Sequence, residues 1–455
     1  MIRAFVDREE ERRILDEEWQ KAGGQMIILY GRRRIGKTRL LTEFIQGKQG
    51  ILSFSEDVAS SIQIKQFQTE CAAFFDDDLL ASLRIETWDQ IFTYLARKPL
   101  QKRAYLVIDE FTYLIKNDPS ILSALQKAWD TALSSSNWCI LLCGSMLGLM
   151  SDLALSATSP LYGRRTRDML LEGLPFVHAK KFLDQPFPDA LRTYLTIGGI
   201  PEYLLKAADY VSFSEFVERE FFSRFGYFYR EPYFILSQEF RELKTYQSIL
   251  NAIAEGNTAP GAIAQFCSMD ARRIYPYLGG MTRLGIVERE LPILVDTRHG
   301  VYQIKDTVFD FWYSFVFPNR EAIETNAFRP SAPAMDRYFG KRFENFVRRE
   351  FVLRILPGSR VGRWWWKGEE IDVVAVDDQE GSIVFGECKW GALDRRGARG
   401  VLTRLEAKTE MVRHDRYPKE RYLLVAGIVE GKEDLRNEGY LVYDLADIEG
   451  FVKGE

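Results

Sequence analysis

A glycine-rich octapeptide near the N-terminus constrains the fold of this chain more than any other feature. It begins at Gly31, follows the pattern G-x-x-x-x-G-K-T and ends at Lys37 and Thr38, between a strand-like run over 26–30 and a helix-like run over 39–46. In that setting glycines let the backbone wrap around phosphates, the lysine reaches the β and γ oxygens, and the threonine hydroxyl ligates Mg²⁺. The sequence predicts a loop that binds ATP with Mg²⁺, formed by Gly31, Arg32, Arg33, Arg34, Ile35, Gly36, Lys37 and Thr38.

Two acidic residues follow a second apolar run, residues 104–108. At the tip of a strand, Asp109 would hold Mg²⁺ through water, and Glu110 would activate the water that attacks the γ-phosphate. A protein that only binds nucleotide, or a kinase of small molecules, does not need the second carboxylate. The sequence therefore favours hydrolysis of ATP, with Glu110 catalytic and with Thr38 and Asp109 at the metal.

Polar residues after a third strand-like run and in a later loop have two interpretations each. Ser145 follows the run 139–143 directly, where it would either contact the γ-phosphate or form an ordinary turn at the strand end. Arg164 and Arg165 end the loop sequence SPLYGRR. One of them would neutralise transition-state charge, within the chain or from a neighbouring subunit of a homo-oligomer, unless the loop is only a solvated basic segment.

Length and hydrophobic patterning divide the chain into segments. At roughly 150 residues per domain, 455 residues suggest about three domains. Apolar runs alternate with helical stretches up to residue 167, which predicts parallel strands covered by helices, and the chain then turns helical and aromatic. We expect an α/β multidomain chain with a nucleotide-binding parallel-sheet domain over 1–167, a helical lid or connector over 168–235, a winged-helix domain over 236–327 and another α/β domain over 328–455.

The winged-helix expectation rests on three helix-like segments followed by a hairpin, over 239–254, 259–266, 270–284, 286–291 and 301–306. The third helix carries residue types that suit contact with a DNA groove and its phosphates: Arg272, Arg273, Tyr275 and Tyr277. Binding of a protein, or folding back on the nucleotide-binding domain as a regulatory lid, is the alternative.

The last segment begins with a proline-bearing stretch over 328–335, expected to be a linker, and a helix over 338–353. Asp372 then opens an apolar strand, and Glu387 and Lys389 end another. A hairpin would bring Asp372 beside the last two, which share one strand face. Paired carboxylates favour Mg²⁺ or Mn²⁺, and the adjacent lysine could orient or deprotonate water for attack on a phosphodiester. The alternative is a surface hairpin with alternating charges.

Several motifs together resemble those of the archaeal-type ATPase family, a branch of the STAND and AAA+-like P-loop NTPases that often carries a C-terminal nuclease-like domain. The motifs are FVDREEE from residue 5, GRRRIGKT, LVIDEFTYL, LLCGS, SPLYGRRT and GGIPEYL. The resemblance implies a P-loop NTPase fold and ATP hydrolysis. It also places Phe5 and Arg8 near the adenine, and Gly199, Ile200 and Pro201 near the nucleotide from the lid side, although a helix cap or a turn accounts for both segments equally well.

The C-terminal pattern resembles the PD-(D/E)xK nuclease superfamily, although the proline of that name is absent. This resemblance implies a restriction-endonuclease-like fold, with Asp372 and Glu387 as metal ligands and Lys389 as a catalytic residue. Glu344, in the helical sequence RFENFVRRE, matches the additional catalytic acid of the Holliday-junction-resolvase-like branch.

A surface for nucleic acid has to be local, because the net charge of the chain is −4. Residues 391–421 hold nine Lys or Arg against five Asp or Glu, which would grip phosphates without reading sequence, unless they form a solvated helix face. The three tryptophans over 364–366 could stack on unpaired bases, or pack between domains. Consecutive strand residues cannot all face one core, so at least one of the three should be exposed or covered by another domain.

The chain shows no signal sequence and no apolar run long enough for a membrane span, so we expect a cytoplasmic protein. Its five cysteines, without metal-like pairing, are expected to be mostly buried and reduced. The histidines His178, His299 and His414 have no ligand spacing, and no zinc site is expected.

These patterns predict an ATP-hydrolysing switch that couples nucleotide state to DNA binding and to metal-dependent cleavage. The alternative is a regulatory ATPase whose C-terminal domain binds DNA or a protein without cleaving it. A small-molecule kinase is disfavoured by Glu110 and by the additional domains.

Overall fold

The computed structural model describes residues 6–296, 300–412 and 416–454, and its internal contacts divide the chain into two units. The first unit comprises Met1–Gly173 and Ile200–Glu202, and the second comprises Leu174–Gly199 and Tyr203–Glu455. The chain therefore leaves the first unit after Gly173, returns for one short segment, and then leaves again.

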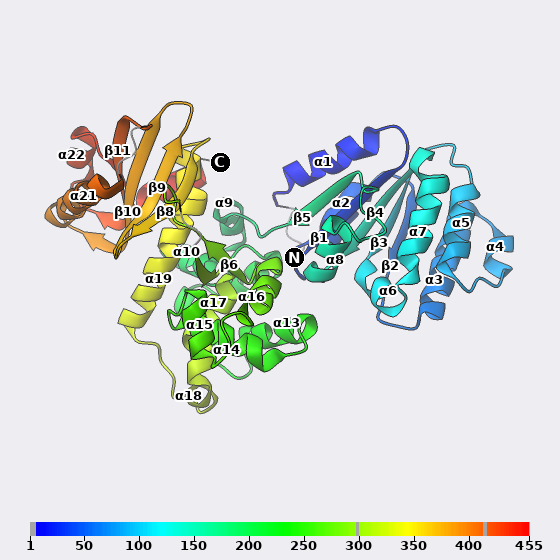
Figure 1. Ribbon diagram of the computed structural model, residues 1–455, viewed down its shortest axis with the longest axis horizontal. Coiled ribbons are helices and arrows are strands. Elements are labelled where there is room, and N and C mark those ends of the chain that lie inside the picture. Colours follow the sequence, from blue (N-terminus) through cyan, green and yellow to red (C-terminus); the bar gives the residue numbers. More distant parts are fainter. Residues whose placement is uncertain (1–5, 297–299, 413–415, 455) are drawn as a thin grey trace. The chain divides into compact units, whose positions relative to one another are not determined.

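A five-stranded parallel sheet forms the centre of the first unit within the described residues (Figure 1). Its strand order is β2-β3-β4-β1-β5, with β1 (Gln25–Gly31), β2 (Gly50–Phe54), β3 (Ala104–Asp109), β4 (Trp138–Gly144) and β5 (Arg167–Leu171). Every residue of β1 and β4 is buried, as expected for central strands covered on both faces. The parallel sheet predicted from the apolar runs is confirmed.

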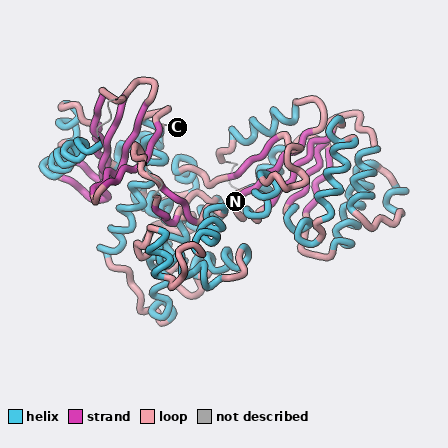
Figure 2. The backbone as a smooth tube through the Cα atoms, viewed as in Figure 1, coloured by secondary structure: helices cyan, strands magenta, loops and turns pink. Residues whose placement is uncertain are grey.

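Helices flank this sheet and are drawn in cyan beside the magenta strands in Figure 2. In α5 the buried side chains Trp88, Ile91, Phe92 and Leu95 recur at helical spacing, and Thr87 caps the first turn. The helices of this unit are α1 (Glu9–Gln20), α2 (Lys37–Ile45), α3 (Ser60–Phe75), α4 (Asp78–Ser82), α5 (Trp88–Arg97), α6 (Phe111–Asn117), α7 (Ser120–Thr131) and α8 (Leu147–Leu155).

Strand β5 lies where sequence analysis expected the helical connector to begin, at residue 168. It pairs in parallel with β1, from Ile27↔Arg167 to Gly31↔Leu171. Only Met169 and Leu171 are buried, so this edge strand lacks the continuous apolar run that marks the central strands. The helical interpretation was therefore wrong for these residues.

The following segment is helical, with α9 (Phe176–Ala179), α10 (Phe187–Ile197), α11 (Pro201–Ala207), α12 (Phe213–Glu220) and α13 (Glu231–Glu239). Three helices and an antiparallel hairpin come next, namely α14 (Leu243–Ala254), α15 (Pro260–Phe266), α16 (Ile274–Arg283), β6 (Val287–Glu290) and β7 (Val301–Ile304). Their order agrees with the sequence-based expectation, and membership of the winged-helix class stays a prediction.

The stretch over 328–335, expected to be a linker, already contains the start of a long helix. α19 (Ala332–Phe346) begins with Pro333 in its first turn, where the missing N–H leaves no hydrogen bond unmade. It continues through a π-helical turn, Val347–Phe351, into α20 (Val352–Ile355). Two short helices precede it, α17 (Thr307–Phe311) and α18 (Arg320–Glu324).

The last part of the second unit is built on a mixed sheet of five strands, counted over the residues that the structure describes. The order is β12-β11-β10-β9-β8, where β8 and β10 pair antiparallel with β9, and β11 pairs parallel with β10 and β12. The strands are β8 (Arg360–Trp366), β9 (Glu369–Asp377), β10 (Ser382–Leu393), β11 (Lys419–Val429) and β12 (Leu441–Tyr443). The helices are α21 (Arg395–Thr409), α22 (Lys432–Asn437) and α23 (Leu445–Lys453).

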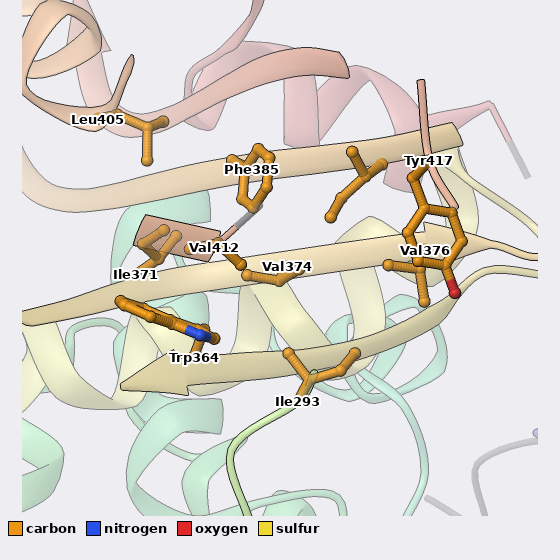
Figure 3. Close-up of a cluster of buried hydrophobic side chains, with 10 residues drawn as sticks. Ile293, Trp364, Ile371, Val374, Val376, Phe385, Leu405, Val412 and Tyr417 are labelled. Atoms are coloured by element: carbon orange, nitrogen blue, oxygen red, sulfur yellow. The ribbon is translucent and has the colours of Figure 1, made fainter. Parts of the chain in front are cut away.

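The segment that follows β6 contributes to the core of this mixed sheet. Ile293 is buried among Trp364 of β8, Ile371 of β9 and further apolar side chains (Figure 3). Its backbone N–H donates to the carbonyl of Arg363 at 2.9 Å. Ion pairs Glu288–Arg349 and Glu290–Arg363 lie nearby. The β6–β7 hairpin is thereby attached to the C-terminal sheet.

Ile293→Ala should lower the free energy of unfolding by about 2–4 kcal/mol, because it removes buried methyl groups and leaves a cavity in this core. Leu291→Ala is the matched control, because Leu291 is 48 % exposed and its truncation should change little. Urea denaturation measures both. Equal effects of the two substitutions would contradict the role assigned to Ile293.

No helix in the described parts of the chain is both long and apolar enough to cross a membrane. All five cysteines fall in those parts and are free thiols, and all but Cys267 are buried, in agreement with the sequence analysis.

Candidate functional sites

The glycine-rich loop connects β1 to α2, as predicted, and encloses the Lys37 ammonium. Gly31 is required here, because a Cβ at this position would lie 2.7 Å from the carbonyl oxygen of Leu171. Lys37 Nζ donates to the carbonyls of Gly31 at 2.9 Å and Arg32 at 3.0 Å. Burial lowers the pKa of Lys37 from its ordinary value. A phosphate anion bound in the loop would strongly stabilise the charged form of this lysine.

Thr38 and Asp109 meet at the edge of the sheet. The Thr38 hydroxyl donates to Asp109 Oδ2 at 2.6 Å, and Asp109 is 3 % exposed. The two residues follow β1 and end β3, which are separated in the sheet by β4 alone. Two hard oxygen atoms thus converge beside the phosphate-binding loop, which is the donor set that Mg²⁺ prefers.

Glu110 and Ser145 form the next part of this edge. The Ser145 hydroxyl donates to Glu110 Oε2 at 2.8 Å, and the Ser145 backbone N–H reaches the same oxygen at 3.2 Å. Glu110 has φ 51° and ψ 40°, a left-handed conformation that costs a non-glycine residue of order 1 kcal/mol and is common at functional sites. The network holds this carboxylate in one orientation.

Arg33 connects the loop to the same network, which the sequence did not indicate. Its Nε lies 3.4 Å from Ser145 Oγ, and its Nη2 donates to the Tyr113 hydroxyl at 2.7 Å. Tyr113 lies on α6, directly after the acidic pair. No local pattern links Arg33 to Tyr113, so only the fold brings them together.

The flanking segments that the resemblance implicated lie against the loop. Arg8 donates to the carbonyls of Glu172 at 2.6 Å and Ile35 at 3.5 Å. A Cβ on Gly36 would lie 4.0 Å from Pro201, and Arg34 pairs with Glu202 at 3.2 Å. Phe5 lies outside the described residues. Contact of any of these with adenine stays a prediction.

The two arginines of the SPLYGRR loop are held by acidic residues of the same unit. Arg164 forms two hydrogen bonds with Asp130, each of 2.8 Å, and Arg165 pairs with Asp168 at 2.8 Å. Within one chain, a role at the phosphates would require either arginine to leave its partner.

In the second unit, β9 and β10 bring the predicted carboxylates together. Their antiparallel pairing runs from Ser382↔Asp377 to Gly386↔Val373, one step before Asp372 and Glu387. Lys389 Nζ lies 2.8 Å from Glu387 Oε2 and 3.7 Å from Asp372 Oδ2. Asp372 Oδ2 also accepts the backbone N–H of Cys388 at 2.9 Å. The expectation that a hairpin joins these three side chains agrees with the geometry.

The sequence analysis missed two cations at this site. Lys408 Nζ, from α21, donates to Glu387 Oε1 at 2.9 Å and to the Glu370 carbonyl at 3.0 Å. Arg348 donates to the Asp372 carbonyl at 2.7 Å. Lys408 had been counted only as part of a basic stretch, because helix packing alone determines which of those residues faces the carboxylates.

Electrostatics distinguish the three carboxyl groups. Burial, and then the charge of Asp372, raises the pKa of Glu344 to about 7. Burial, and then Glu387, raises the pKa of Asp372 to about 6. Burial also opposes ionisation of Glu387, but hydrogen bonds from Lys389 and Lys408 outweigh it and hold its pKa below the ordinary value. The charge of Asp372 thus acts on Glu344, and the catalytic role that the superfamily resemblance implies for Glu344 stays a prediction.

The raised pKa of Glu344 predicts a pH-dependent stability effect. Between about pH 4.5 and 7 the folded chain binds more protons at this group than the unfolded chain, so its contribution to stability falls as pH rises. In metal-free buffer, Glu344→Gln should be more stable than the wild type by about 1–2 kcal/mol at pH 8, with a smaller difference at pH 5. Urea titrations at both pH values measure this, with the exposed Glu369→Gln as a control. A difference independent of pH would contradict the assignment.

Some of the basic residues proposed to contact nucleic acid already pair with acidic side chains of the same domain. On α21, Arg395 pairs with Asp434 of α22 at 3.0 Å, and Arg399 pairs with Glu438. Arg404 and Lys419 are exposed, whereas Arg413 and His414 fall outside the described residues. Some of the excess charge over 391–421 is thus neutralised within the domain.

The aromatic residues singled out for bases are divided between core and surface. Trp364 is buried, whereas Trp366, the last residue of β8, is 47 % exposed, which agrees with the expectation that at least one of the three tryptophans would be exposed. Tyr275 is 54 % exposed beside the exposed Arg272 and Arg273, and the Tyr277 hydroxyl donates to Glu242 at 2.6 Å.

Among the described residues, no group of three or more His, Cys, Asp or Glu has the arrangement of a metal-binding cluster. A divalent ion at the C-terminal site would therefore depend on the pair Asp372 and Glu387, which already share the Lys389 ammonium.

A phosphate-binding loop, an acidic pair and a polar strand end on one parallel sheet define a P-loop ATPase. Residues 5–207 match a family described as an ATPase domain predominantly from Archaea, and residues 312–401 match a family of archaeal and bacterial proteins of unknown function. The chain is 32 % identical over 455 residues to the uncharacterized protein MJECL04 of Methanocaldococcus jannaschii, covering 97 % of this chain and 99 % of the relative. The chain belongs to this archaeal-type ATPase family.

Other similarities are more limited. The uncharacterized ATP-binding protein MJ0423 of the same organism is 47 % identical over 45 residues, 10 % of this chain and 76 % of that protein. The Walker-type ATPase PABY2304 of Pyrococcus abyssi has a TM-score of 0.49 and 22 % identity, over 68 % of this chain and 96 % of that chain. The ORC2 protein of Aeropyrum pernix has a TM-score of 0.43 and 12 % identity, over 70 % and 93 %.

Proposed function

We propose that this ATPase is a switch in which ATP hydrolysis governs a DNA-directed, metal-dependent nuclease site in the C-terminal domain. The observation that carries the hydrolytic part is the convergence of Thr38, Asp109, Glu110 and Ser145 on one edge of the sheet. In this proposal the same residues would bind the phosphates, hold the metal ion and orient the catalytic carboxylate.

On the ATPase side, Lys37 would bind the β and γ oxygens, and Thr38 and Asp109 would hold Mg²⁺. Bound Mg²⁺ neutralises charge on the phosphates. Glu110 would accept a proton from the attacking water, while Ser145 keeps that carboxylate pointed at the γ-phosphate. Arg33, held by Tyr113, lies at the same edge and adds positive charge.

The nucleotide state of the first unit would be coupled to the second unit through the chain segments that connect them. Ile200–Glu202 belongs to the first unit, whereas the residues on both sides belong to the second. In this segment Glu202 pairs with Arg34 of the phosphate-binding loop, and Pro201 lies close to Gly36. On the preceding helix, Tyr194 donates to the half-buried Glu350 at 2.5 Å. A shift of the loop with nucleotide state would thus be passed along α10 and α11.

On the nuclease side, Asp372 and Glu387 are the residues that would hold Mg²⁺ or Mn²⁺. The pair already shares one cation, Lys389, which supports the idea that a cation can sit between them. A bound divalent ion would polarise the scissile phosphate. Lys389 would orient water, and Glu344, with its raised pKa, could move a proton.

The second candidate function is a regulatory ATPase whose C-terminal domain binds DNA or a protein without cleaving it. It is favoured by one observation: both oxygens of Glu387 already accept hydrogen bonds from lysines. In this case the ion pairs between Glu387 and the two lysines stabilise the fold, and the site binds no divalent ion.

A cleavage assay separates the two candidates. Purified full-length protein is incubated with linear and supercoiled DNA and Mg²⁺ or Mn²⁺, with and without ATP, beside Asp372→Ala and Lys37→Ala. The nuclease proposal predicts metal-dependent cleavage that Asp372→Ala removes while ATP turnover persists. Cleavage unchanged in Asp372→Ala would refute the assignment. ATP turnover lost in Lys37→Ala, with no cleaved product under either metal, would support the regulatory alternative.

A further inference from the structure

The Glu387 carboxylate is clamped between two lysines that come from different elements. Lys389, two residues further along β10, donates to Oε2 at 2.8 Å. Lys408, from α21, donates to Oε1 at 2.9 Å. A divalent ion that binds either oxygen must share or displace one of these ammonium groups.

The charges at this site balance without an added ion. Arg348, Lys389 and Lys408 bring three positive charges to the carboxyl groups of Glu344, Asp372 and Glu387. A divalent ion would therefore leave an excess of positive charge at the site unless one cation left or an anion arrived. In a partly buried cluster such an excess is unfavourable, because solvent screens it poorly.

Lys408 is the cation best placed to move. Its side chain is 26 % exposed, and besides Glu387 it contacts only a backbone carbonyl, that of Glu370, among the hydrogen bonds that the structure records for it. The Lys389 side chain is more exposed, at 41 %, but it lies between both carboxylates of the pair and is held by two ion pairs instead of one. A long flexible side chain on a helix can swing its ammonium toward solvent at modest cost.

We propose that Lys408 is a positioning residue that blocks metal binding at Glu387 in the free protein and releases it when a phosphodiester takes up the lysine ammonium. The inference rests on the proposed nuclease function and adds its regulation: the divalent ion and the nucleic-acid backbone bind cooperatively. Because coupling is reciprocal, each increases the affinity for the other by the same factor.

The test is a titration of Mn²⁺ into full-length protein, followed by the electron paramagnetic resonance of the free ion, with and without a short DNA duplex. Lys408→Met keeps the aliphatic stem and removes the charge. Arg404→Met removes an exposed charge from the same helix and is the matched control. Glu387→Gln measures the Mn²⁺ that binds elsewhere in the chain, and this amount is subtracted.

Lys408→Met should bind Mn²⁺ about tenfold more tightly than the wild type without DNA, and Arg404→Met should match the wild type. Addition of the duplex should tighten Mn²⁺ binding of the wild type by a similar factor, and that of Lys408→Met much less. Equal Mn²⁺ affinity of wild type and Lys408→Met would overturn the role of Lys408 while leaving the metal site intact. Uptake no greater than that of Glu387→Gln in any protein would instead overturn the proposed metal site itself.

Lys408→Gln is a second variant, which controls for any disturbance of packing by a methionine at this position. Its thermal unfolding is compared with that of Arg404→Met, and it should reproduce the tighter Mn²⁺ binding. A higher Mn²⁺ affinity in Lys408→Met but not in Lys408→Gln would contradict a mechanism based on the lysine charge.

Discussion

Glu110→Gln should reduce ATP turnover by about 10²-fold or more while leaving ATP affinity nearly unchanged. The substitution keeps the size and hydrogen-bonding reach of the side chain toward Ser145 but removes the group that accepts a proton from water. Phosphate release measures turnover, and equilibrium binding of a fluorescent ATP analogue measures affinity.

Ser145→Ala is the informative companion. It removes the hydroxyl that orients Glu110 but leaves the Ser145 backbone N–H in place, so turnover should fall by less than in Glu110→Gln. If Glu110→Gln lost affinity and turnover to the same degree, Glu110 would be a structural residue of the loop.

Lys37→Met should abolish tight binding of ATP. Truncating one partner of a buried, hydrogen-bonded charge pair costs about 2–5 kcal/mol, which corresponds to a loss of affinity of about 30-fold or more. Lys37 is buried and its ammonium donates to two loop carbonyls, which hold it at the position proposed for the β and γ oxygens. Isothermal titration with Mg²⁺-ATP measures the loss.

Arg39→Met serves as the control for Lys37→Met, because Arg39 lies on the same helix, is about half exposed and pairs with Glu43. Its affinity for ATP should stay within about twofold of the wild type, as expected for an exposed ion pair. Comparable losses in both variants would indicate that α2 had been disturbed, and would contradict a specific role for Lys37.

The sequence indicated those parts of the ATPase site that are contiguous in the chain. The phosphate-binding loop, the acidic pair and Ser145 each follow an apolar strand, and the carboxyl ends of parallel strands share one edge. The strand order could not be derived, so the position of Ser145 between the loop and Asp109 became evident only in the sheet. β5 escaped prediction because an edge strand with two buried side chains has no strong pattern.

The C-terminal site shows a second limit of sequence analysis. The period-two pair Glu387 and Lys389, and a hairpin that returns to Asp372, were expected from spacing. Lys408 and Arg348 approach from helices, and their direction depends on tertiary packing. The paired carboxylates had been taken to favour a divalent ion. Cations of the chain itself already neutralise them, so charge clustering alone does not imply a metal.

Phosphate release by the purified wild-type chain tests the central claim most directly, because it asks whether the edge formed by Thr38, Asp109 and Glu110 hydrolyses the nucleotide that the loop binds. The expected result is steady release from ATP that requires Mg²⁺ and ceases when the ion is chelated. Tight binding of Mg²⁺-ATP with no release, both alone and with DNA present, would contradict it.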